Sequence, residues 1–83
     1  MNLKENPFNA WYSNGKITIT GTATTGARAA LYDLQGRKLM ETRLEDTRRN
    51  NFEVAGMKNG VYLLRIFSGE KYHTLKVPVI SEN

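Results

Sequence analysis

The chain has 83 residues, no cysteine, and twelve lysines and arginines against eight acids, which gives a net charge of +4. Without cysteine there are no disulfides or thiolate metal sites, and a chain of this length forms one small domain with a stability of roughly 4–8 kcal/mol. No apolar run is long enough for a membrane helix or for the core of an export signal peptide. We therefore expect a single domain over residues 1–83, with its core at about 6–80.

The basic residues are spread along the sequence rather than gathered in one segment. Only Arg37-Lys38 and Arg48-Arg49 are adjacent pairs, and acidic residues lie between many of the other cations. This pattern favours a solvated surface of mixed charge over the alternative, a dedicated polyanion site. We expect no nucleic-acid binding and no insertion into a membrane.

Three aromatic residues lie close together after a bend predicted at Asn6-Pro7, namely Phe8, Trp11 and Tyr12. We expect them to pack under a sheet edge or to close one end of the core. The alternative is a stacking platform for a sugar or a base. A turn is predicted at Ser13-Asn-Gly15.

Residues 16–20 alternate strictly between polar and apolar side chains, with Ile17 and Ile19 on one face. This period predicts an antiparallel strand that is buried on one side. The small polar segment 21–26 is expected to be a loop. The next strand is predicted at 27–32, with three residues on its inner face: Ala27, Ala29 and Leu31.

Asp33-Leu-Gln-Gly36 is predicted to reverse the chain, because aspartate can accept a hydrogen bond from the backbone two residues on and glycine tolerates the closing φ. Residues 37–44 are predicted as a strand, with a helix over 37–46 as the alternative. A polar loop is expected at 45–51, followed by a short strand over 52–55.

The densest run of β-forming residues, Val61 to Phe67, follows Asn59-Gly60. Both of its faces are mostly apolar, so we expect a central strand that is covered on both sides. A tight turn is predicted at Ser68-Gly-Glu70 and a last strand at 72–80. Its inward residues are predicted to be Leu75, Val77 and Val79, with His73, Lys76 and Pro78 on or near the exposed side.

Seven short strands separated by glycine and asparagine turns predict an all-β fold, an immunoglobulin-like antiparallel β-sandwich of about seven short strands. An open barrel is the alternative. The one histidine, His73, has no second histidine or cysteine to form a metal site with, and no catalytic motif occurs. We therefore expect no enzyme activity, no cofactor and no metal. Because Pro78 places the last strand at an edge or a bulge, that strand could pair with a partner or with a second copy, giving a homodimer.

Five motifs occur in order along the chain: Asn6-Pro7, the strand with Ile17 and Ile19, Leu31-Tyr-Asp-Leu-Gln-Gly-Arg37, Gly60-Val-Tyr62-x-Leu-x-Ile66 and Leu75-Lys-Val-Pro-Val79. In this order and spacing they resemble the type A C-terminal sorting domain of the Bacteroidota type IX (Por) secretion system. The sequence departs from that pattern at Glu5, which replaces an apolar or aromatic lead-in, at Pro78, and at Ser81-Glu-Asn83, which extends past the usual end.

The resemblance implies an address label at the C-terminus of a larger exported cargo, which reaches the periplasm by its own N-terminal signal peptide. The outer-membrane translocon and its shuttle protein would recognise the folded domain. A surface sortase would then remove it and attach the cargo to anionic lipopolysaccharide, at the outer membrane or cell surface. The family's recognition residues correspond to Gly60, Tyr62, Lys76, Val77 and Val79, and its motif positions to Asn6, Pro7, Asp33, Gly36, Gly60 and Tyr62.

Two other functions are compatible with the composition. Trp11 and Tyr12, together with the basic surface, would suit a carbohydrate-binding or adhesive β-sandwich module. A purely structural β module within a multidomain protein is the third hypothesis.

Overall fold

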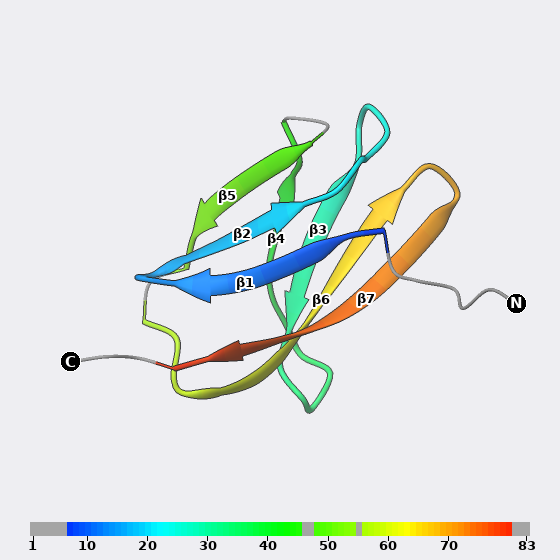
Figure 1. Ribbon diagram of the computed structural model, residues 1–83. Helices are drawn as coiled ribbons and strands as arrows, with labels where there is room; N and C mark the ends of the chain where they lie inside the picture. Colours follow the sequence, from blue (N-terminus) through cyan, green and yellow to red (C-terminus); the bar gives the residue numbers. More distant parts are fainter. Residues whose placement is uncertain (1–6, 46–47, 55, 81–83) are drawn as a thin grey trace, which may run out of the picture.

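The computed structural model describes residues 7–45, 48–54 and 56–80, which form seven strands and no helix. The strands are β1 (Asn9–Ser13), β2 (Lys16–Thr20), β3 (Arg28–Tyr32), β4 (Lys38–Arg43), β5 (Arg49–Glu53), β6 (Gly60–Ser68) and β7 (Lys71–Val79). They form two antiparallel sheets, in the orders β1-β2-β5 and β4-β3-β6-β7, which pack face to face (Figure 1). The predicted all-β, immunoglobulin-like sandwich of about seven strands is confirmed.

Three hairpins build the sandwich, β1–β2, β3–β4 and β6–β7, and the other connections cross between the sheets (Figure 1). In a constant-type immunoglobulin domain the fourth strand belongs to the sheet of the first strand. Here β4 pairs with β3 instead, so the second sheet has four strands and β6 is one of its two inner strands. The edge strands β1 and β7 contact each other across the boundary between the sheets.

The core lies between the sheets and is formed by the alternate residues of each strand. Ile17 and Ile19, predicted to face inward, are at most 1% exposed. Other large, fully buried side chains come from both sheets and from the segment before β1: Phe8, Leu31, Leu64, Ile66, Val77 and Val79. The predicted inner face of β3 is also confirmed. This burial, rather than any disulfide, is the main favourable term in the folding of the chain.

One face of β6 packs in the core and the other faces solvent. Leu64 and Ile66 are completely buried, whereas Val61 is exposed and Arg65 is half-buried. The prediction of a central strand is confirmed, but the prediction that both faces are covered is wrong. No third layer lies over this sheet among the described residues, and an antiparallel sheet commonly leaves one face in water.

The aromatic segment at the start forms a strand that the sequence did not predict. A two-residue turn, in which Asn14 and Gly15 have φ of 50° and 78°, pairs β1 with β2. Positive φ at both positions is the type I′ geometry that suits tight hairpins. Phe8 is 2% exposed and packs in the core as predicted, while Trp11 is 41% exposed on the outer face.

Strand β5 also replaces part of a predicted loop. Residues 45–51 were expected to be a polar loop, yet β5 begins at Arg49 and pairs with β2 throughout. Only Asn50 and Phe52 of this strand are partly buried, and the other side chains are polar and exposed. Backbone hydrogen bonds to β2, rather than side-chain hydrophobicity, therefore define the strand. Asp46, Thr47 and Ala55 lie outside the described residues, as does Asn6 of the predicted entry bend.

The predicted strand over 37–44 is confirmed as β4, and the helical alternative is excluded. A register shift against β3 falls at Leu39, between the pairs Leu31–Met40 and Tyr32–Lys38. Met40 therefore packs against the core while Leu39 is 47% exposed. This irregularity explains why simple alternation did not identify the inner face of β4.

The last strand is an edge strand, as Pro78 predicts, and Val77 and Val79 are buried. The predicted exposure of His73 is wrong. It shares the inner side of β7 with Leu75 and Val77, and its ring centroid lies 5.3 Å from that of Phe8. The imidazole therefore covers the end of the core beside Phe8.

A close approach at Gly21 gives a test of how the segment before β1 is held. A Cβ at Gly21 would lie 2.5 Å from the carbonyl oxygen of Pro7 and 2.7 Å from Cδ1 of Phe8. Gly26, in the same loop, also has positive φ but has no atom within 4 Å of such a Cβ. We expect Gly26→Ala to cost about 1–2 kcal/mol from backbone strain and Gly21→Ala about 2–4 kcal/mol, because it must also displace Phe8.

Urea unfolding of the wild type and both variants, monitored by the fluorescence of Trp11, measures these losses. Equal losses for the two variants would show that Phe8 is not held against Gly21.

Candidate functional site

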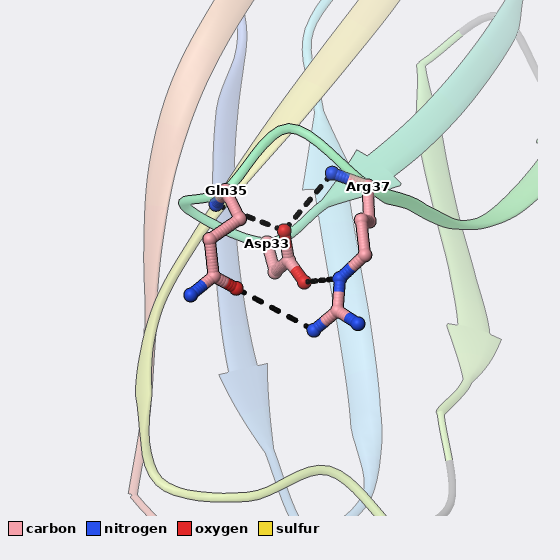
Figure 2. A network of polar contacts seen from close by, with 3 residues as sticks. All are labelled: Asp33, Gln35 and Arg37. Carbon is pink, nitrogen blue, oxygen red and sulfur yellow. Dashed lines mark hydrogen bonds and ion pairs between the residues drawn. The ribbon is translucent and has the colours of Figure 1, made fainter.

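The turn between β3 and β4 is organised around the carboxylate of Asp33 (Figure 2). Oδ1 accepts hydrogen bonds from the backbone N–H groups of Gln35 and Arg37, both at 2.9 Å, and Oδ2 accepts one from Nε of Arg37 at 2.8 Å. The N–H of Gly36 donates to the carbonyl of Asp33 at 3.0 Å. The predicted bond to the backbone two residues on is confirmed, and the carboxylate is committed to its own loop.

These bonds favour the ionised form of Asp33. The backbone N–H of Arg37, followed by its side chain and the N–H of Gln35, holds the pKa of Asp33 below its ordinary value, against a smaller opposing effect of burial. Gly36 closes the turn at φ 89°, a conformation that residues with a Cβ adopt only with strain.

The Gly-x-Tyr motif begins β6. Gly60 has φ 153°, and the ring of Tyr62 packs partly against the core. The phenol hydroxyl of Tyr62 donates a 2.8 Å hydrogen bond to the backbone carbonyl of Lys58. Tyr62 thus fastens the segment that leads into β6 to the strand itself, and it is only half-buried rather than enclosed in the core.

The residues for which the resemblance implies partner recognition lie together at one end of the β6–β7 ribbon. Gly60 is opposite Val79 and Tyr62 is opposite Val77 in the register, and Lys76 lies in the next pair. Val77 and Val79 are buried, whereas Gly60 and Lys76 are exposed. Tyr62 shares the inner side of the ribbon with Val77, whereas Lys76 lies on the outer side with Leu63.

The Asp33 turn and the Gly-x-Tyr motif border the same open depression, of about 540 Å³. They meet because β3 and β6 are antiparallel neighbours, so the end of β3 lies beside the start of β6. Both segments are at the lower end of the molecule in Figure 1. The sequence analysis missed this meeting, since motifs more than twenty residues apart are brought together only by the strand order. The lining residues are Asp33, Gln35, Arg37, Leu39, Gly56, Met57, Lys58, Asn59 and Tyr62.

The aromatic pair near the N-terminus does not form a common platform. Tyr12 lies opposite Ile17 and packs against the core, whereas Trp11 lies opposite Thr18 on the outer face. The guanidinium of Arg49 is 5.9 Å from the centroid of the Trp11 ring. The two side chains therefore lie on opposite faces of β1, yet both border one open depression of about 520 Å³ together with Pro78 and Ile80.

The described parts of the chain show neither a metal site nor a membrane-spanning helix. Residues 7–45, 48–54 and 56–80 contain no group of three potential metal ligands and no helix long and apolar enough to cross a membrane. His73, the one histidine, packs against Phe8.

The bonds at Asp33 predict a pH-dependent contribution to stability. Because the folded state lowers the pKa of Asp33, its contribution is present above the unfolded pKa of about 4 and is lost as the pH falls through the lower folded value. We expect Asp33→Asn to lower Tm at neutral pH, with the difference from wild type shrinking in acid. Thermal melts between pH 7 and about pH 2 measure this. Glu70→Gln is the matched charge change, and a similar Tm loss for it would contradict the assignment.

The two roles of Tyr62 can be separated by two substitutions. Tyr62→Phe removes only the hydrogen bond to Lys58 and should cost about 0.5–1.5 kcal/mol. Tyr62→Ala also removes the ring from the core surface and should cost about 2–3 kcal/mol, less than the value for a fully buried ring. Denaturant unfolding measures both. Equal costs would show that the ring contributes no packing.

A model of the family described as "secretion system C-terminal sorting domain" matches residues 12–80. The matched region begins in β1 and ends after β7, so it contains the Asp33 turn, the Gly-x-Tyr strand and the last strand. No curated protein matches the chain. The family that the sequence motifs resemble is confirmed by this match: the chain belongs to the secretion system C-terminal sorting domains.

Proposed function

We propose that this domain is the C-terminal signal that directs an attached cargo through the outer-membrane translocon of the type IX secretion system. The observation that carries the proposal is the family match over residues 12–80. The cargo would pass through the periplasm and end at the outer membrane or cell surface, or be released. The domain contributes recognition and no catalysis, and the translocon, its shuttle protein and the sortase are its proposed partners.

The surface that supports this function is the end of the β6–β7 ribbon together with the adjoining depression. Gly60 and Lys76 are exposed, with Lys76 on the outer side of the ribbon, and Tyr62 is half-buried on the inner side. The Asp33 turn forms the other wall and is held by its own hydrogen bonds. A surface that is ordered before binding loses less conformational entropy when a partner docks. We therefore assign recognition to Gly60, Tyr62 and Lys76, with Val77 and Val79 as their buried support.

Pairing of two copies through β7 is a separate proposal. Strand β7 is the edge of its sheet, but Pro78 has no N–H to donate and the neighbouring β1 contacts β7. These features restrict the edge available to a second copy. Size-exclusion chromatography with light scattering would decide between one copy and two.

The export function is tested with the full cargo in its native host, by fractionation and surface labelling. Deletion of residues 75–83 should leave the cargo in the periplasm. Normal surface display after this deletion would overturn the proposal. Because the deletion also removes core residues, a second variant must keep the fold.

Lys76→Glu changes one exposed side chain of β7 and should reduce surface display several-fold. Lys71→Glu, the matched control, makes the same charge change at the far end of β7 and should leave display near the wild-type level. Thermal melts of the isolated chains should show equal stability. Equal display by the two variants would remove Lys76 from the recognition surface.

A further inference from the structure

The fold gathers basic residues that the sequence scatters. We call the outer surface of the four-stranded sheet the basic face. It carries Arg28, Lys38, Arg43, Arg65 and Lys76. They alternate along their strands with residues that pack in or against the core, and Glu41 is the only acid among the strand residues of this face.

The strand residues of this face carry an excess of positive charge. Of the eight cations and two acids that lie in the seven described strands, five cations and one acid are on the basic face, which gives it a charge of +4. A single-sign field confined to one face attracts and orients partners of opposite charge.

Aromatic rings lie beside two of the three arginines of the basic face, Arg65 and Arg28. The guanidinium of Arg65 lies 4.7 Å from the ring centroid of Tyr72 and 5.7 Å from that of Tyr32. Arg28 lies 6.0 Å from the centroid of Phe67, whose ring is itself 6.1 Å from that of Tyr72. Stacking on a ring leaves the edge of a guanidinium able to donate to a carboxylate.

Most of this charge has no ion-pair partner among the described residues. Glu41 pairs with Lys38 at 2.7 Å and with Arg28 at 3.2 Å, and Lys38 followed by Arg28 holds the pKa of Glu41 below its ordinary value. Arg43 lies directly opposite Arg28 in the register and makes no ion pair within the described part of the chain. Like charges placed opposite each other destabilise a sheet, so intramolecular stability does not explain this pair.

The same face contains a hollow that could hold one side chain of a partner. It has a volume of about 260 Å³ and is lined by Tyr32, Gly36, Leu63, Arg65 and Thr74. Arg65 Nε donates a 3.4 Å hydrogen bond to the hydroxyl of Thr74, and the guanidinium has further N–H donors beside the apolar surface of Leu63 and the Tyr32 ring. This combination suits one carboxylate side chain with its methylene groups.

From these observations we propose that the basic face docks onto an acidic surface of a partner protein. The inference rests on the proposed function, because it supplies the chemistry of the partner that recognises the domain. The apolar content of the face favours a protein over a polyanionic glycan, lipid or nucleic acid. Two of its large apolar side chains, Val61 and Tyr72, are 39% and 60% exposed. Tyrosine and arginine are enriched in protein interfaces.

The binding test uses the 83-residue chain, labelled with ¹⁵N, and a random copolymer of glutamate and tyrosine as the acidic polypeptide. Polyglutamate, heparin and phosphatidylglycerol vesicles are the competing probes. We expect the copolymer to bind more tightly than each of them, and its affinity to fall as salt is added. Its binding should shift the amide signals of β3, β6 and β7. Tighter binding of heparin or vesicles, no binding of the copolymer, or shifts confined to the other sheet would overturn the proposal.

Matched variants separate the basic face from general charge. Arg28→Gln with Arg43→Gln should weaken copolymer binding about tenfold. Lys16→Gln with Lys71→Gln removes the same charge elsewhere and should change it less than about twofold. Arg43→Gln alone should leave Tm unchanged or raise it, since it relieves the repulsion with Arg28. Equal weakening by the two pairs, or a marked drop in Tm for Arg43→Gln, would overturn the assignment.

The same pairs in the full cargo distinguish this inference from the proposed function. We expect the Arg28/Arg43 pair to reduce surface display and the Lys16/Lys71 pair to leave it unchanged. If deletion of 75–83 blocks export while the Arg28/Arg43 variant is displayed normally, the basic face is not the docking surface and the sorting function stands. Normal display after the deletion would overturn both.

Discussion

The structure depends on the two-sided character of β6, which hydrogen-bonds to β3 on one edge and to β7 on the other. Its inner residues Leu64 and Ile66 are completely buried, and its outer residues lie at the surface. Because side chains alternate along a strand, a register slip of one residue would exchange these two sets. The core and the outer face of the sheet are therefore specified by the same pairing.

Local chemistry made part of this fold predictable. The alternation of Ile17 and Ile19 defined a half-buried strand, and Asp33 with Gly36 defined a turn whose hydrogen bonds the structure shows. In both cases the determining interaction spans only a few residues. The motifs of the sorting-domain family could also be identified in the sequence, because they combine such local features in a fixed order.

Features that depend on pairing partners were not predictable in the same way. Strand β5 is mostly polar, and its backbone bonds to β2 rather than its side chains make it a strand. The orientation of Leu39 and Met40 follows from a register shift against β3. The Asp33 turn lies beside Tyr62, and Arg43 lies opposite Arg28, because of the order of the strands in the sheet. The alternation of side chains within one segment does not predict that order.

The placement of residues suggests how stability and recognition are divided within so small a domain. Val77 and Val79, expected from the family resemblance to take part in recognition, are buried, and we propose that they contribute to it only through the shape of the β6–β7 ribbon. The exposed residues that alternate with them along β7, Lys76 and Pro78, and those on the outer side of β6, can change without opening a cavity. A sheet with one face in water can thus carry repulsive charge, such as Arg28 opposite Arg43, at a cost smaller than the stability supplied by its buried face. Alternate residues of the same strands can therefore serve different purposes: the inner residues form the core, and the outer residues form the proposed docking surface.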